Sequence, residues 1–218
     1  MTYKEFGNIY LTWRKSRGDR RIIVGIIKKN ATGVRFTYTI TPQEAEEAGF
    51  VPYADFPSLE KEYTQNVLEV FALRLNKPER PDIQQYYDFW AIDAEHQQNK
   101  YYMLAHTQGL LATDNFEFLA DFNPIKGLSF VSEICGLSHL QIPSNEVSIG
   151  DSLTWEREPL NKFDKYAVKV FKGELFVGYV KTVHNQIFSK NNSSRLKISV
   201  KSIESNGHLN RVFIKIFT

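Results

Sequence analysis

Six short runs in which apolar and polar residues alternate fill the C-terminal part of the chain. A period of two is typical of β-strands that bury one face, and turn-forming residues separate the runs. So many short strands in so little chain must cover one another's edges and apolar faces, which favours a small barrel or a sandwich. The runs are residues 128–135, 151–157, 166–171, 175–180, 196–203 and 211–217.

The N-terminal part begins with a similar pattern. Residues 8–40 alternate in three runs divided by two turn-rich breaks, which predicts an antiparallel meander. A helix is expected next, because Thr41 can cap its start and Glu44 stands at the capping-box spacing. Pro42 suits the first helical position, and Gly49 can end the helix.

Two further helices are expected before the β-rich part, over residues 58–76 and 82–91. The first has an apolar residue at every fourth position, which marks one buried stripe: Tyr63, Val67, Phe71 and Leu75. The second is crowded with aromatic residues, which we interpret as core. Residues 101–106 and 115–119 are strand-like. Together these elements predict an α+β domain of antiparallel strands plus helices over residues 1–124.

Charge is distributed unevenly along this chain, whose formal net charge is +2. The stretch from Leu160 to the end has 11 basic and 3 acidic residues. Such an excess produces a positive field suited to a polyanion, although a solubilising surface would have the same composition. Basic residues also cluster on the first hairpin. They could form a solvated turn or contact a nucleic-acid backbone, and the sequence leaves both interpretations. These residues are Arg14, Lys15, Arg17, Arg20 and Arg21.

Several classes of protein are disfavoured. The N-terminal residues lack the apolar run of a signal peptide, and no run reaches the roughly 18 apolar residues of a membrane span. Cys135 has no second cysteine with which to pair. We therefore expect a cytoplasmic protein with no membrane partner. The five histidines are dispersed, Asp93, Glu95 and His96 are interpreted as a polar loop, and no phosphate-binding glycine loop is found, so we expect no metal, no cofactor and no enzyme.

The loop before residue 166 is the most informative segment. Asn161 and Asp164 are typical turn residues, because their side chains bond neighbouring backbone amides. The same loop holds Lys162, Phe163 and Lys165, which would place an aromatic face and two cations at the mouth of a barrel. Stacking of a base on an aromatic ring contributes about 1–3 kcal/mol, and cations hold the phosphates. The residues of this loop are therefore compatible with two roles, binding of a single nucleic-acid strand or a purely structural turn.

This segment resembles a HIRAN domain. The pattern of that family is a strand, a Glu-Pro-x-Asn-x-aromatic-Asp loop, then Ala-Val-x-Val and Gly-Tyr-Val or Gly-Tyr-Ile. Residues 133–139 are similar to the opening strand of the family, so the resemblance implies an all-β OB/SH3-like barrel over residues 125–218. The matching positions are Glu158, Pro159, Asn161, Phe163, Asp164, Ala167, Val168, Val170, Gly178, Tyr179 and Val180.

HIRAN domains of fork-remodelling translocases grip the terminal nucleotides of a 3′ single-stranded end, which would place this protein in DNA repair. By resemblance, Phe163 would stack on a base, and Asp164 would accept a hydrogen bond from the terminal 3′ hydroxyl. Asn161 would contact the last nucleotide. The family usually has tyrosine where Phe163 stands, so a phosphate contact from a hydroxyl is lost here.

The resemblance implies three further site residues. Tyr179 and Lys181 would flank the phosphates, and His139 would stack from the other side. The motor and zinc-binding domains that accompany the barrel in those translocases have no counterpart in this sequence. We therefore expect a binding protein rather than a motor.

Scattered positions in the first part resemble the small N-terminal subdomain of HipA-type toxin kinases. They are Phe36-Thr-Tyr38, Gly49-Phe50, Phe56-Pro57, Phe71, Arg74-Leu75 and Arg80-Pro81-Asp82. The resemblance implies a module that docks to a protein partner. Two functions remain: an accessory protein that binds single-stranded DNA at 3′ ends, or a protein-interaction module of a toxin–antitoxin or phage-defence system without DNA-end binding.

Overall fold

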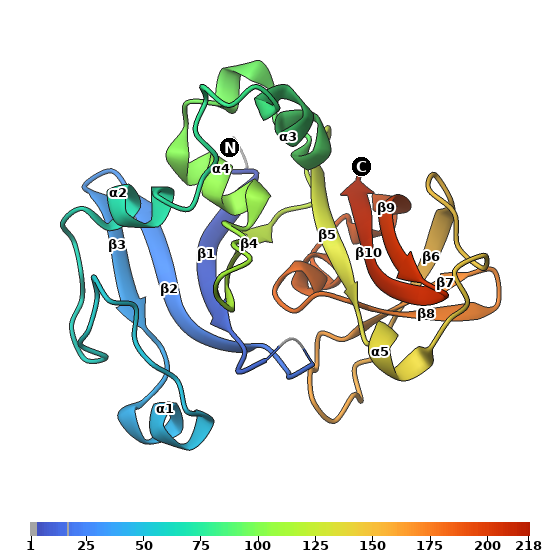
Figure 1. The fold of residues 1–218 in the computed structure, drawn as a ribbon, viewed down its shortest axis with the longest axis horizontal. Coiled ribbons are helices and arrows are strands. Elements are labelled where there is room, and N and C mark those ends of the chain that lie inside the picture. The colour runs from blue at the N-terminus through green and yellow to red at the C-terminus, as the bar shows by residue number, and fades with distance from the viewer. Residues whose placement is uncertain (1–3, 17) are drawn as a thin grey trace. The chain divides into compact units, whose positions relative to one another are not determined.

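The computed structural model describes residues 4–16 and 18–218, and the chain divides into two compact units (Figure 1). Gly7–Asp121 forms one of them, which we call the sheet unit. Phe122–Thr218 forms the other, together with the described residues before Gly7, and we call it the barrel unit.

The sheet unit is built on a four-stranded sheet in its described residues, with the strand order β3-β2-β1-β4. Neighbouring strands β1 and β2, and β2 and β3, are antiparallel, with an irregularity in β1 between Leu11 and Thr12. The predicted meander is therefore confirmed. The strands are β1 (Phe6–Trp13), β2 (Ile22–Asn30), β3 (Gly33–Tyr38) and β4 (Phe116–Phe122).

The first helix, α1 (Pro42–Ala48), begins at the predicted capping box. The backbone N–H of Glu44 donates to Thr41 Oγ1 at 3.2 Å, and the Glu44 carboxylate accepts from the N–H of Thr41 at 2.9 Å. Gly49 ends the helix in the left-handed conformation, at φ 69°. The sequence prediction is confirmed at both ends.

The predicted helix over residues 58–76 is wrong in most of its length, because α2 covers only Val67–Ala72. Tyr63 instead forms an antiparallel bridge with Phe36 of β3, with N–O distances of 2.8 and 2.9 Å between the two residues. Its ring also stacks on the Phe36 ring, at 6.2 Å between centroids. The spacing of four residues therefore comes from two different structures, the bridge at Tyr63 and the short helix α2. Both pack apolar residues against β3.

The predicted strand over residues 101–106 is also wrong, because this segment forms α4 (Lys100–Thr107). Asn99 caps the helix by accepting a hydrogen bond from the N–H of Tyr102 at 3.1 Å. Every residue from Tyr101 to Thr107 is buried, so the segment has no polar face by which its period could be recognised. The predicted third helix is confirmed as α3 (Ile83–Trp90), which is followed by the short η1 (Ala94–His96).

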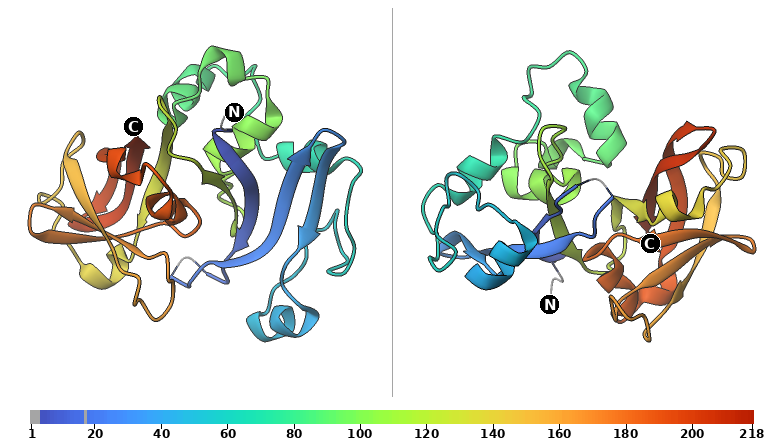
Figure 2. Two further views of the ribbon diagram at one scale, coloured as in Figure 1. Left: turned by 180° about the vertical axis from the view of Figure 1, so that it is seen from behind. Right: turned by 60° about the horizontal axis from the view of Figure 1, so that its bottom comes forward.

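Six strands in the described residues of the barrel unit close into a barrel with the order β10-β5-β8-β7-β6-β9 (Figures 1 and 2). All six neighbouring pairs are antiparallel. The predicted small barrel is thus confirmed. Its elements are β5 (Ser129–Cys135), α5 (Leu137–Leu140), β6 (Ser152–Arg157), β7 (Val168–Lys172), β8 (Leu175–Val180), η2 (His184–Ser189), η3 (Ser193–Arg195), β9 (Lys197–Asn206) and β10 (His208–Phe217).

Closure of the barrel depends on a glycine where β8 meets β5. Gly178 has φ +127°, a backbone conformation that is open almost only to glycine. A Cβ atom there would lie 2.5 Å from the carbonyl oxygen of Cys135 and 2.6 Å from Ile134 Cγ2. The two strands can approach each other only because this position lacks a side chain.

We expect Gly178→Ala to destabilise the barrel unit, by about 1–3 kcal/mol from the backbone conformation alone and by more because of the clash with β5. Gly173→Ala is the matched control, because Gly173 has φ +58° but nothing within 4 Å of its Cβ position. The control should lose only about 1–2 kcal/mol. Urea unfolding of the whole chain measures the free energy of unfolding of both variants. Equal losses of stability would show that the close approach of β8 to β5 does not add to the cost at Gly178.

Candidate functional site

The loop that joins β6 to β7 is closed by its own backbone. The N–H of Glu158 donates to the carbonyl oxygen of Ala167 at 2.8 Å, and the N–H of Ala167 donates to the carbonyl oxygen of Asp164 at 2.9 Å. A third bond, 3.0 Å long, runs from the N–H of Asn161 to the carbonyl oxygen of Glu158. We call residues 158–167 the β6–β7 loop, and its ends are held together like those of a tight turn.

Asn161 organises the tip of this loop. Its Oδ1 accepts hydrogen bonds from the N–H groups of Phe163 and Asp164, at 2.9 and 3.1 Å. Its Nδ2 donates to Glu158 Oε2 at 2.6 Å. This is the turn chemistry that the sequence predicts, and it occupies both ends of the amide. The structure therefore gives Asn161 a positioning role in the loop.

Glu158 connects the loop to the wall of the barrel. Besides Asn161, its carboxylate accepts a hydrogen bond from the Tyr179 hydroxyl of β8 at 3.1 Å and pairs with Lys169 of β7 at 2.6 Å. The bond from Lys169 is the main reason why the pKa of Glu158 lies below its usual value, and the Asn161 amide adds to it. Burial raises the pKa of Tyr179, and the neighbouring carboxylate raises it further.

Phe163 projects from this braced loop into solvent. Its side chain is 72% exposed, although it is a large apolar residue. Lys162 and Lys165 beside it are also exposed, and Lys165 Nζ lies 5.0 Å from the centroid of the Tyr166 ring. Leu160 on the same loop is 92% exposed. The loop thus presents an aromatic face and two ammonium groups together, as the sequence predicts.

Asp164 lies half-buried beside Phe163 and is held from two sides. Its Oδ1 accepts from the N–H of Tyr166 at 2.8 Å, and its Oδ2 accepts from Asn185 Nδ2 at 2.7 Å. A carboxylate oxygen has two lone pairs, so each oxygen retains capacity for a further donor. Asn185 was not anticipated from the sequence, because it follows Asp164 by 21 residues and belongs to η2.

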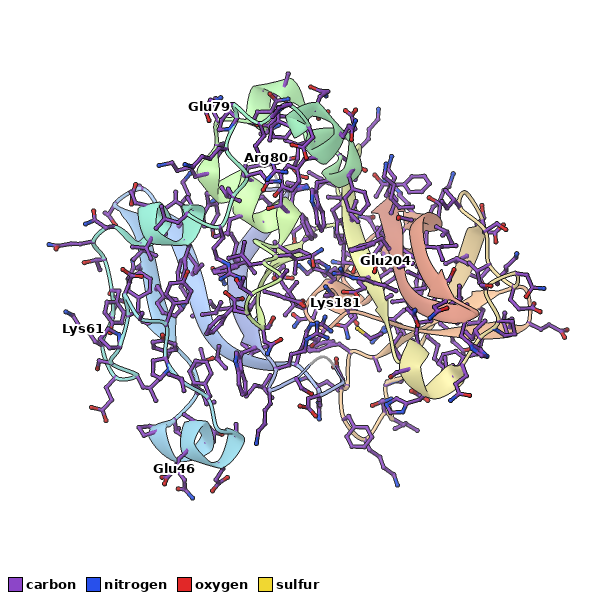
Figure 3. The ribbon with its side chains drawn as sticks, in the orientation of Figure 1. Glu46, Lys61, Glu79, Arg80, Lys181 and Glu204 are labelled. Carbon is purple, nitrogen blue, oxygen red and sulfur yellow. The ribbon has the colours of Figure 1, made fainter. Side chains whose placement is uncertain are left out.

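Lys181 does not lie at the surface, where the sequence leads us to expect it. Lys181 is labelled in Figure 3. Its side chain is fully buried, and its ammonium group pairs with Glu133 of β5 at 2.8 Å. Glu133 also accepts from Arg211 Nε at 2.8 Å. The expectation that Lys181 flanks a phosphate is therefore corrected: its charge is used inside the unit, because a buried ammonium requires a close counter-ion.

Tyr179 and His139 occupy neighbouring elements. Tyr179 pairs with Cys135 at the end of β5, and its ring lies 3.9 Å from the position of a Cβ on Gly136. Gly136 is the N-cap of α5, on which His139 is exposed. The imidazole of His139 is therefore exposed to solvent on α5, the helix whose first residues lie beside the Tyr179 ring.

Two arginines of the basic hairpin of the sheet unit form ion pairs with one carboxylate. Arg21 binds the buried Glu117 through two hydrogen bonds of 2.7 Å, and Arg14 lies 3.6 Å from the same carboxylate. Lys15 and Arg20 are exposed, and Arg17 lies outside the described residues. The hairpin therefore has a structural use for two of its cations.

Asp93, Glu95 and His96 bring one potential ligand atom each to within 4.8 Å of one another. The His96 ring stacks on Tyr102 at 3.9 Å between centroids, which accounts for its place at the surface of the sheet unit. Both carboxylates are exposed. Glu95 and His96 lie in η1, and exposed acidic groups of this kind commonly lack a metal.

Over residues 4–16 and 18–218, no helix has both the length and the apolar character that crossing a membrane requires.

No family model and no curated protein matches the chain. Among solved structures, the crystal structure of the HIRAN domain of human HLTF is similar over 40% of this chain and 74% of that chain, at 18% sequence identity and a TM-score of 0.33. A crystal structure of a protein from Lactobacillus plantarum is similar over 43% of this chain and 96% of that chain, at 18% identity and a TM-score of 0.33. Similarity at this level carries no assignment for this chain.

Proposed function

We propose that this chain is a nucleic-acid-binding accessory protein, and that its barrel unit binds single-stranded DNA at 3′ ends through the β6–β7 loop. The observation that carries the proposal is the 72% exposed ring of Phe163 beside the carboxylate of Asp164, on a loop fixed by Asn161 and Glu158. Such a loop presents a stacking face and a hydrogen-bond acceptor without first having to become ordered.

The two groups have separate tasks. The terminal base stacks on the Phe163 ring, an interaction that tolerates any base because every base has a π-face. The terminal 3′ hydroxyl donates to Asp164, whose oxygens retain lone pairs beyond their bonds to Tyr166 and Asn185. A carboxylate repels a phosphate at the same position, so it favours a free hydroxyl. The negative charge of Asp164 would therefore select a 3′ end with a free hydroxyl.

The phosphates on the 5′ side of the end interact with the exposed Lys162 and Lys165. Tyr179 reaches the same loop through its bond to Glu158, and we include the exposed His139 as a second stacking face. Lys181 has no part in the proposal because of its pairing with Glu133. Part of the basic excess after Leu160 is paired with Glu133 and Glu158, and the cations that remain exposed supply the long-range attraction. We assign no catalytic step, metal or cofactor to this region.

For the sheet unit we propose a docking function toward a protein partner, in keeping with its resemblance to the N-terminal subdomain of HipA-type kinases. The alternative for the whole chain is a protein-interaction module without DNA-end binding. The 92% exposure of Leu160 favours this alternative, because exposed apolar residues next to an aromatic ring are also typical of protein interfaces. Variants of the two apolar residues distinguish the functions.

Phe163→Ala should weaken binding of a single-stranded oligonucleotide with a 3′ hydroxyl by about 1–3 kcal/mol, because the stacking face is lost. Leu160→Ala is the matched control on the same loop and should change the affinity little, since an aliphatic side chain offers no ring. Fluorescence anisotropy measures both. Parent-like binding by Phe163→Ala would remove the ring from the site, and equal losses in both variants would support an apolar contact instead of stacking.

A phosphate added to the 3′ end should weaken binding at least about tenfold, or roughly 1.4 kcal/mol, whereas a 5′ phosphate should have little effect. The physical reason is the repulsion between the added phosphate and the Asp164 carboxylate. The measurement compares the parent protein on three oligonucleotides of one sequence that differ only at their ends. Indifference to both phosphates would contradict end capture while leaving binding along the strand possible.

A further inference from the structure

The carboxylate of Asp164 is held by a residue from a different element. Asn185 lies in the first turn of η2 and is 2% exposed. Its Nδ2 donates to Asp164 Oδ2 at 2.7 Å, whereas the other carboxylate oxygen is held by the loop's own backbone, through the N–H of Tyr166. The orientation of Asp164 therefore depends on η2 as well as on the β6–β7 loop.

The turn that presents Asn185 has a disfavoured backbone. Val183 has φ 68° and ψ −55°, and it is fully buried. A positive φ is a true outlier for a β-branched residue, and such a conformation persists only where the surroundings enforce it. Here the N–H of Asn185 donates to the carbonyl oxygen of Lys181 at 3.0 Å, and His184 Nδ1 lies 2.9 Å from Ser132 Oγ. The two residues that follow Val183 are thus held in place, His184 by a side chain of β5 and Asn185 by the preceding backbone.

Asn185 also carries an unsatisfied polar atom. Its Oδ1 is buried and has no hydrogen-bond partner among the described residues. A buried acceptor in this state lowers stability, and a leucine of similar shape would avoid the loss. Two unfavourable features, at Val183 and Asn185, therefore accompany one favourable contact, the hydrogen bond to Asp164. This is the pattern expected where local stability has been given up for function.

We propose that Asn185 is the positioning residue that sets the preference of the site for a free 3′ hydroxyl, an inference that rests on the proposed function. The second torsion of an aspartate side chain is broad, so one hydrogen bond leaves the carboxylate able to turn. Bonds at both oxygens fix it. A 3′ hydroxyl donates a hydrogen bond, and that bond is stronger when the accepting carboxylate is held in a fixed orientation. A terminal phosphate is an acceptor itself, so it gains nothing from the orientation of the carboxylate. Loss of Asn185 should therefore affect hydroxyl ends selectively.

The test compares the parent with Asn185→Leu and Asn185→Ala, and uses Asn210→Leu as the control on an exposed asparagine of β10. Affinities for oligonucleotides with a 3′ hydroxyl and with a 3′ phosphate are measured for each protein by anisotropy. We expect both Asn185 variants to lose about tenfold in affinity for the hydroxyl end and to keep the parent affinity for the phosphate end. The control should match the parent. Asn185→Leu removes both the unsatisfied Oδ1 and the bond to Asp164, so its melting temperature should stay within about 2–4 °C of the parent's.

Four outcomes would overturn the inference. An equal loss for both oligonucleotides, or failure of both Asn185 variants to fold, would make Asn185 a structural residue only. If the parent prefers the 3′ hydroxyl and both Asn185 variants keep that preference, the role of Asn185 is refuted and the proposed function remains intact. A parent that does not distinguish the two ends would refute the proposed function itself, and the inference with it.

Discussion

The carboxylate of Glu158 is the contact on which the candidate site depends. It joins Asn161 in the loop, Lys169 in β7 and Tyr179 in β8, at 2.6, 2.6 and 3.1 Å. Because the two strands belong to a closed barrel, the loop cannot move independently of them. Without this carboxylate, the amide of Asn161 would lose its anchor and the backbone N–H groups at the tip would lose their fixed acceptor.

A loop braced in this way can keep an apolar ring in water. The side chains of Asn161 and Asp164 accept hydrogen bonds from backbone N–H groups of the loop, and Phe163 is left 72% exposed. A mobile loop would instead fold such a ring onto apolar surface, which is favourable by the hydrophobic effect. The exposure of Phe163 is therefore a consequence of the hydrogen bonds behind it. The same order reduces the entropy that a ligand must overcome in binding.

The sequence predicts the parts of this arrangement that depend on neighbouring residues. Strand alternation identifies the barrel strands, and the spacing of Asn161 and Asp164 indicates the turn that exposes Phe163. Contacts between distant segments leave no local pattern, which is why the burial of Lys181 against Glu133 and the bond from Asn185 to Asp164 emerge only from the fold. The segment over residues 100–107 was misjudged for a related reason, because burial on all sides removes the period that distinguishes helix from strand.

We propose that a DNA end is held at the tip of the β6–β7 loop. The most direct measurement is a nuclear magnetic resonance titration of the whole chain, with backbone amides followed as a short single strand with a 3′ hydroxyl is added. We expect the largest shifts on the amides of Phe163, Asp164 and Tyr166, with smaller shifts at Tyr179. Shifts that leave this loop unchanged and cluster elsewhere, for example at the exposed Lys15 and Arg20 of the sheet unit, would contradict the proposal.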